Sequence, residues 1–138
     1  MRKTFLLLPL ALFAQLAFAI DANDVEAYKK NYSEQLRPMV MKKLGMDRPD
    51  LTAGAIKREA DAYVAKMAGC QLEGLAIFPE QYREKAILPV AQGGDVAQAT
   101  QALNEELKKD IDNGKISKDE VMTIIQSAQQ AVQICANS

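Results

Sequence analysis

Histidine and tryptophan are both absent from the 138-residue sequence. Without histidine, the chain has no Ser-His-Asp or Cys-His nucleophilic site and no metal site with imidazole ligands. Aromatic residues are few, at 6% of the chain, and Phe78 is the only phenylalanine after residue 18. The sequence therefore excludes the two commonest hydrolytic designs and predicts a core made of aliphatic side chains.

The chain also has no large excess of positive or negative charge. The 17 basic and 18 acidic residues are interspersed and give a formal net charge of -1. Nucleic acids and anionic membranes each need a concentrated basic patch, which this chain does not have. After the N-terminal segment, no apolar run approaches the roughly 20 residues that a membrane-spanning helix needs. We therefore expect no nucleic-acid partner and no stable membrane insertion of the mature chain.

The N-terminal segment has the three-part pattern of a secretory signal peptide. A positive start, Met1 to Lys3, precedes an apolar run from Phe5 to Phe13, and Ala17-Phe18-Ala19 is an A-x-A cleavage signal. The alternative is an uncleaved membrane anchor, but the run is shorter than the roughly 20 residues required. We predict that residues 1–19 are removed and that residues 20–138 form a single soluble helical domain in the periplasm or outside the cell.

Apolar residues of the mature chain recur at helical spacing, and no strand-like alternation is present. Glycine, proline and capping residues divide the pattern into segments. The sequence therefore predicts an all-α fold, a small bundle of four long helices and one short helix. The first expected helix covers residues 25–44, and Pro38 bends or divides it. Thr52 caps the second helix, which frays near Gly69 or Gly74, and a short third helix begins at Pro79 and stops at Pro89. Asp95 caps the fourth helix, and the fifth begins at Ser117 with Glu120 in a capping box.

The two cysteines are expected on the inner faces of two helices. Cys70 closes a helical stripe of apolar residues that also contains Ile56, Ala60, Tyr63 and Met67. Cys135 ends a similar stripe in the last helix. In an oxidising compartment such a pair favours an intramolecular disulfide over an intermolecular bridge or a redox pair. Closing a loop of about 65 residues would stabilise the fold by roughly 4 kcal/mol.

The segment from Asp110 to Glu120 looks like a calcium loop of the EF-hand kind. Such a loop needs oxygen ligands at fixed positions around a central glycine. When Gly114 is aligned with the central glycine of an EF-hand loop, Lys109 falls at a position that needs an oxygen ligand. When Asp110 is aligned with the first ligand instead, the segment has one residue too few before the glycine. Helix caps at the two ends explain the same residues. We expect no metal ion here and no cofactor elsewhere.

Pairs of carboxylates are the remaining candidates for acid–base catalysis. Each pair lies on a predicted polar helix face, where a shifted pKa is not expected. We therefore identify no catalytic residue and do not expect an enzyme. The pairs are Glu59 with Asp61, Glu80 with Glu84, and Glu105 with Glu106.

Two groups of residues are candidates for contact with a partner. Met39, Met41 and Met46 are flexible, polarisable side chains that can adapt to a protein surface, bind Cu(I), or fill the core. The seven-residue spacing of Met39 and Met46 favours the core. Phe78 and Tyr82 lie in an irregular stretch, where aromatic residues often serve recognition. The alternative is that Phe78 simply closes the bundle.

Three functions remain open. At the level of architecture, an export signal, a small helical domain and one disulfide are similar to periplasmic holdase chaperones and small immunity proteins. The first hypothesis is therefore an exported protein that binds another protein, as an immunity, inhibitor or chaperone module. The second is a carrier of a lipid or another apolar ligand that opens between its helices. A carboxylate-dependent enzyme is the third, and the oligomeric state stays open.

Overall fold

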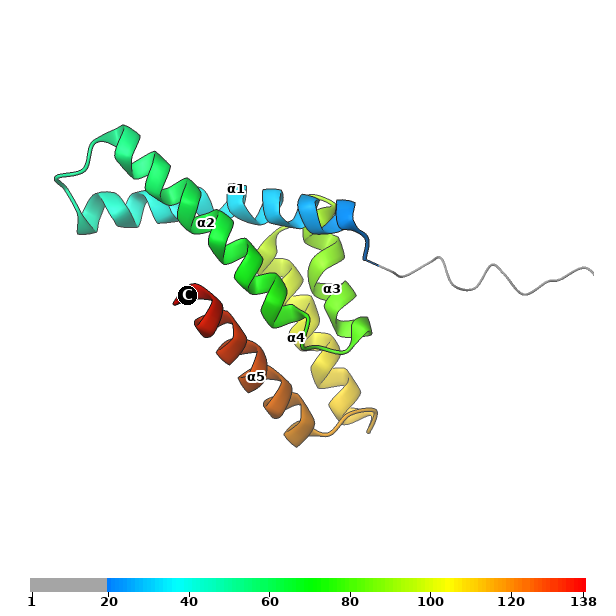
Figure 1. Cartoon of the computed structure of the whole chain (residues 1–138). Helices are drawn as coiled ribbons and strands as arrows, with labels where there is room; N and C mark the ends of the chain where they lie inside the picture. Colours follow the sequence, from blue (N-terminus) through cyan, green and yellow to red (C-terminus); the bar gives the residue numbers. More distant parts are fainter. Residues whose placement is uncertain (1–19) are drawn as a thin grey trace, which may run out of the picture.

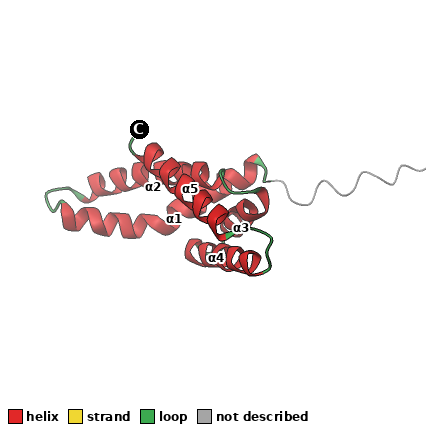
Figure 2. Cartoon of the chain, turned by 90° about the horizontal axis from the view of Figure 1, so that it is seen from below, coloured by secondary structure: helices red, strands yellow, loops and turns green. Residues whose placement is uncertain are grey.

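The computed structural model describes residues 20–138, which form five helices and no strand (Figures 1 and 2). The predicted signal peptide, residues 1–19, lies outside the described residues. The predicted all-α bundle with one short helix is confirmed, the short helix having 12 residues. The helices are α1 (Ala22–Asp47), α2 (Ala53–Leu75), α3 (Glu80–Ala91), α4 (Val96–Asp112) and α5 (Lys118–Ala136).

Side-chain caps begin four of the helices, and three of these caps are at the predicted residues. Asp21 begins α1 in a complete capping box. Thr52, Asp95 and Ser117 each accept a hydrogen bond from the backbone N–H three residues further on, at 3.1, 2.9 and 3.0 Å. Each bond satisfies an N–H that has no partner inside the helix. At Ser117 only this half of the predicted capping box forms, because the Glu120 side chain makes no hydrogen bond in return to a described residue.

The helix ends differ from the prediction at proline and glycine. Pro38 lies inside α1 and does not divide it, and Pro89 lies inside α3 rather than stopping it. Helix α2 continues past Gly69 and ends at Leu75, next to Gly74, which is one of the two predicted ends. Packing on neighbouring helices outweighs these local preferences, because α1 packs extensively on both α2 and α3. Proline and glycine therefore indicate the right number of helices, but they do not predict where each helix ends.

Four helix pairs hold the bundle together. Helices α1 and α2 form a hairpin, α3 packs on α1, α4 packs on α3, and α5 packs on α2. Helices α4 and α5 follow each other in the chain but make few contacts with each other. Figures 1 and 2 show that the connected ends of α1 and α2 extend beyond the end of α5. The bundle is thus loosely closed between α4 and α5 and only two helices thick at the end of the hairpin.

The core consists of two clusters of buried side chains, and three tyrosines take part in it. The expectation of a purely aliphatic core is wrong here, because Tyr28, Tyr32 and Tyr82 are buried. A tyrosine ring buries a large apolar area while its hydroxyl still needs a polar partner. One cluster comprises Phe78, Tyr82, Ala86, Leu103, Leu107, Val121 and Ala128, and the other Tyr28, Tyr32, Ala68, Ile87, Val90 and Ala99.

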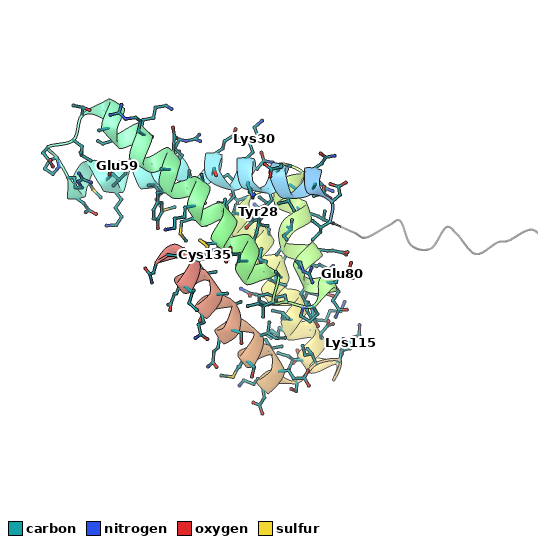
Figure 3. All side chains as sticks on the ribbon, in the orientation of Figure 1. Tyr28, Lys30, Glu59, Glu80, Lys115 and Cys135 are labelled. Carbon is teal, nitrogen blue, oxygen red and sulfur yellow. A yellow bond between two sulfur atoms is a disulfide. The ribbon has the colours of Figure 1, made fainter. Side chains whose placement is uncertain are left out.

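The predicted disulfide joins Cys70 of α2 to Cys135 of α5, with a Cα–Cα distance of 5.4 Å. Figure 3 labels Cys135 at the junction of these two helices. One turn beyond Cys70, Gly74 lets the helices approach closely, since a Cβ atom there would lie 2.7 Å from Cγ2 of Val132. The disulfide and this close approach both hold α5 on α2.

Tyr63 is exposed, although it was expected to face inward with Cys70. Its side chain is 52% exposed, whereas Ala60 and Val64 are fully buried. The carbonyl oxygen of Ser138 accepts a hydrogen bond of 2.8 Å from Nζ of Lys66, so α5 ends level with Lys66. Tyr63 lies one turn further toward the end of the hairpin, where α5 no longer covers α2.

Candidate ligand-binding groove

A groove of about 730 Å³ opens where α4 and α5 make few contacts with each other. All five helices contribute to its walls, and apolar side chains predominate. None of the described residues that line the groove carries a charge. They are Tyr28, Tyr32, Gln71, Gly74, Leu75, Phe78, Ala86, Val90, Val96, Thr100, Leu103, Asn104, Ile125, Ala128, Gln129, Val132 and Gln133.

Helical periodicity places apolar side chains deep in the groove and uncharged polar ones at its rim. On α4, Thr100 and Asn104 are exposed, whereas Leu103 is buried in the core. On α5, the amide side chains of Gln129 and Gln133 are likewise exposed, one turn apart. Residues four apart lie on the same face of a helix. The groove therefore has an apolar interior between two rims of uncharged polar groups.

Tyr28 and Tyr32 form the part of the groove that α1 contributes. Their rings stack, with centroids 5.7 Å apart and an interplanar angle of 24°. The side chains are only 3% and 5% exposed, yet neither hydroxyl makes a hydrogen bond to another described residue. Neither hydroxyl is completely enclosed either. Figure 3 shows Tyr28 on the side of α1 that faces the other helices.

Burial also changes the acidity of these two hydroxyls. Desolvation raises the pKa of Tyr28, and the neighbouring Tyr32 raises it further. Desolvation likewise raises the pKa of Tyr32, with a smaller contribution from Tyr63. A raised pKa keeps the phenol protonated. Both tyrosines are therefore neutral at physiological pH and can donate as well as accept a hydrogen bond.

A second, smaller cavity of about 230 Å³ lies beside Asp110 of α4, whose side chain is buried. Oδ2 of Asp110 accepts a hydrogen bond of 2.7 Å from the Tyr82 hydroxyl. Oδ1 makes no hydrogen bond, and Nζ of Lys115 lies 3.8 Å from it. Desolvation and the bond to Asp110 raise the pKa of Tyr82. Oδ1 of Asp110 is therefore a buried polar atom without a hydrogen-bond partner among the described residues, which is costly in a folded protein.

The spacing of α4 contains a signal for Asp110 that the sequence interpretation missed. Leu103, Leu107 and Asp110 recur at offsets of four and three, so the carboxylate lies on the buried face of the helix. The Asp110 carboxylate accepts a hydrogen bond from Tyr82 through Oδ2, and its Oδ1 faces Nζ of Lys115 in the loop that looks like a calcium site. In that loop Gly114 has a φ of 72° and ends α4. No group of three carboxylate or cysteine ligands converges within residues 20–138.

The methionines predicted as a contact surface are on the hairpin, away from the groove. Met39 and Met46 are 68% and 67% exposed, so the core interpretation of their spacing is wrong. Met41 is partly buried. Within residues 20–138, no third helix covers the end of the hairpin, which explains why core spacing there does not produce burial. A role of these methionines in binding a partner stays a prediction.

The predicted aromatic contact residues are both buried. Phe78 and Tyr82 belong to the same core cluster, and Phe78 also lines the groove. They therefore offer no exposed aromatic surface, in agreement with the alternative in which Phe78 closes the bundle. Phe78 remains a candidate for ligand contact because it lines the groove. Tyr82 does not line the groove, and its hydroxyl is hydrogen-bonded to Asp110.

Two of the carboxylates considered for catalysis are engaged in ion pairs. Oε2 of Glu59 lies 2.9 Å from Nη1 of Arg48. Asp61 is bound by Lys57 at 2.9 Å and by Arg37 at 2.6 Å. The hydrogen bond from Lys57, followed by that from Arg37, lowers the pKa of Asp61. A lowered pKa favours the ionised form, which is unsuited to a general acid near neutral pH.

The chain matches no protein-family model, no curated protein and no solved structure. Within residues 20–138, no helix is long and apolar enough to cross a membrane. Functional proposals for this protein consequently rest on its own geometry, and the groove of about 730 Å³ is the feature used for them.

Proposed function

We propose that this protein is an exported carrier that binds an uncharged, largely apolar ligand in the groove between α4 and α5. The groove itself is the observation that carries this proposal. Its volume of about 730 Å³ falls within the roughly 300–1,000 Å³ of typical ligand pockets, which are likewise apolar with a few polar groups. The described lining contains no charge that would favour an ion.

Two structural features indicate that the groove is already formed in the free protein. The disulfide between Cys70 and Cys135 holds α5 on α2, and α4 packs on α3 instead of α5. The two walls are therefore anchored to different helices, and collapse of the groove would require these contacts to change. A preformed site avoids part of the ordering cost of binding.

The sequence of the N-terminal segment supports export, and so does the disulfide. Disulfides persist in oxidising compartments such as the periplasm and the extracellular space. A carrier in such a compartment would transfer apolar molecules through water. We assign no catalytic step to the protein.

The direct test is a titration of the disulfide-bonded chain from Ile20 to Ser138 with diphenylhexatriene. This uncharged hydrocarbon dye fluoresces in apolar surroundings and carries no hydrogen-bonding group. We expect saturable binding of one dye molecule per chain. The absence of saturable binding would overturn the proposal.

A pair of variants locates the dye. Gln129→Trp places a large ring at the groove rim and should weaken dye binding by about tenfold or more, equivalent to about 1.4 kcal/mol. Gln130→Trp introduces the same residue at the next position, which is exposed and does not line the groove. This control should bind the dye like the unmodified chain. Equal losses in both variants would place the dye elsewhere.

A protein partner is the second candidate function, as an immunity, inhibitor or chaperone module. It is favoured by the exposed Met39 and Met46, because exposed flexible apolar side chains serve adaptable binding surfaces. Cross-linking of the mature chain in the exported fraction of its host, read by mass spectrometry, would identify one partner or many. Met39→Lys with Met46→Lys should abolish the cross-link, and Met122→Lys on α5 is the control.

A further inference from the structure

The two buried tyrosines of the groove bear on the chemistry of its ligand. This inference rests on the proposed carrier function and goes further, because an apolar groove alone does not select a polar group. Tyr28 and Tyr32 are four residues apart on α1, so their side chains lie on one face of the helix. Their rings stack on each other, and both residues line the groove.

Neither hydroxyl has a hydrogen-bond partner within the described part of the chain, so water or a ligand must provide one. Each belongs to a buried side chain and makes no hydrogen bond to another residue of the bundle. Buried polar groups are almost always hydrogen-bonded, to protein, to water or to a ligand. The other uncharged polar side chains of the lining on α4 and α5 are exposed at the rim. Gln71 of α2 also lines the groove but is only partly buried, so the two tyrosines are the most deeply buried polar residues of the lining.

An ionic head group would meet no opposite charge in this groove. Transferring an ion from water into apolar surroundings is costly unless a counter-charge compensates. The described lining contains no lysine, arginine, aspartate or glutamate. A neutral hydroxyl or carbonyl group loses less on transfer and recovers hydrogen bonds from the two phenols.

We infer that the ligand is a neutral amphiphile with an aliphatic chain and a hydroxyl, ester or amide group, and that Tyr28 and Tyr32 bind this polar group. The aliphatic chain lies along the apolar interior between α4 and α5. Fatty-acid anions and cationic amphiphiles are the ligands that the groove selects against.

Three amphiphiles with the same aliphatic chain test this selectivity. Dodecanol, dodecanoate and dodecyltrimethylammonium are each used below their aggregation limits to displace diphenylhexatriene from the mature, disulfide-bonded chain. Dodecanol should displace the dye at a concentration about tenfold lower than either ion, a difference of about 1.4 kcal/mol. Equal displacement by dodecanoate or by the ammonium compound would overturn the inference while leaving the carrier function intact.

Conservative variants test the role of the hydroxyls. Tyr28→Phe and Tyr32→Phe keep the rings, so they should leave the affinity for the hydrocarbon dye unchanged and weaken dodecanol binding by about two- to tenfold each. Thr123→Ala removes an exposed hydroxyl of α5 that does not line the groove and should change neither affinity. Unchanged dodecanol binding in both groove variants would overturn the inference. Loss of dye binding in the unmodified chain would instead overturn the carrier function itself.

Discussion

The hydroxyl of Tyr82 on α3 donates a 2.7 Å hydrogen bond to Oδ2 of Asp110 on α4, and both side chains are buried. The bond joins α4 to α3. The other oxygen of the carboxylate, Oδ1, has no hydrogen-bond partner, and Nζ of Lys115 is 3.8 Å away. Because this buried carboxylate has one hydrogen bond, loss of that bond has a large expected effect on stability.

Tyr82→Phe should therefore destabilise the protein by about 1–3 kcal/mol, since it leaves the buried carboxylate without a hydrogen bond. Urea unfolding at neutral pH measures this loss. Tyr63→Phe removes an exposed tyrosine hydroxyl and serves as the control, with an expected change within about 0.5 kcal/mol. Equal stability of the Tyr82 and Tyr63 variants would show that the bond to Asp110 contributes nothing.

The free energy of unfolding should fall as the pH rises above about 10. Desolvation raises the pKa of Tyr28, Tyr32 and Tyr82 in the folded chain, and the bond to Asp110 contributes for Tyr82. In the unfolded chain these phenols ionise at their ordinary pKa, so above it the unfolded state binds fewer protons. The stabilisation is complete below that pH and is lost as the pH rises through the folded-state pKa values.

Urea midpoints measured from neutral pH to pH values above about 10 test this dependence. The decline should be shallower in Tyr28→Phe and Tyr82→Phe, which each remove one of the responsible phenols. Tyrosinate absorbance should also appear at higher pH in the folded chain than in urea. Superimposable titrations of the folded and unfolded chains would contradict the prediction.

Gly74→Ala and Gly69→Ala should have opposite effects, although both lie in α2. A Cβ at Gly74 would lie 2.7 Å from Cγ2 of Val132 and 3.1 Å from the carbonyl oxygen of Ala128, so overpacking should cost about 1–3 kcal/mol. A Cβ at Gly69 meets nothing within 4 Å. The greater helix propensity of alanine should then stabilise the protein by up to about 1 kcal/mol. Thermal unfolding compares the two variants, and a stabilised Gly74→Ala chain would refute the close approach.

The disulfide variants Cys70→Ala and Cys135→Ala should each lose roughly 4 kcal/mol, and the double variant should lose no more. One bond is removed in all three cases. Urea unfolding provides the measurement, with the reduced unmodified chain as an additional reference. Losses that add up in the double variant would mean that each cysteine stabilises the fold independently of the bond.

Local features of the fold were predictable because their causes are local. The caps at Thr52, Asp95 and Ser117 follow from side chains that bind a backbone group three residues away. The pairing of Cys70 with Cys135 was predictable because the chain has only two cysteines, both on apolar helix faces. The caps and the cysteine pairing can be inferred from helix geometry, without knowledge of how the helices pack.

Features that depend on the neighbouring helix could not be read from periodicity. Tyr63 shares a stripe with Cys70 but is exposed, because α5 ends level with Lys66. Met39 and Met46 have core spacing at a place where no helix covers them. How far one helix extends along another is set by the packing of the whole bundle, and it decides burial at these positions.

The groove and Asp110 show the same dependence on long-range packing. Asp110 becomes a buried carboxylate because Tyr82, 28 residues earlier in the chain, lies opposite it. The groove arises because α4 and α5 pack on different helices, which no residue pattern within either helix encodes. The stripe of Leu103, Leu107 and Asp110 was nevertheless a readable signal of a buried acid.

The α1–α2 hairpin extends beyond Ser138, so its end is packed against fewer helices than the part of the molecule near the disulfide. Near Cys70 a covalent bond and several helices restrain the chain, whereas the hairpin end has one helix interface and exposed ion pairs such as Arg48 with Glu59. Such pairs contribute about 1 kcal/mol or less, and thinly packed segments open locally at lower free energy. Amide hydrogens around Gly45 and Ile56 are therefore expected to exchange with solvent earlier than those around Cys70, which native-state hydrogen exchange would measure.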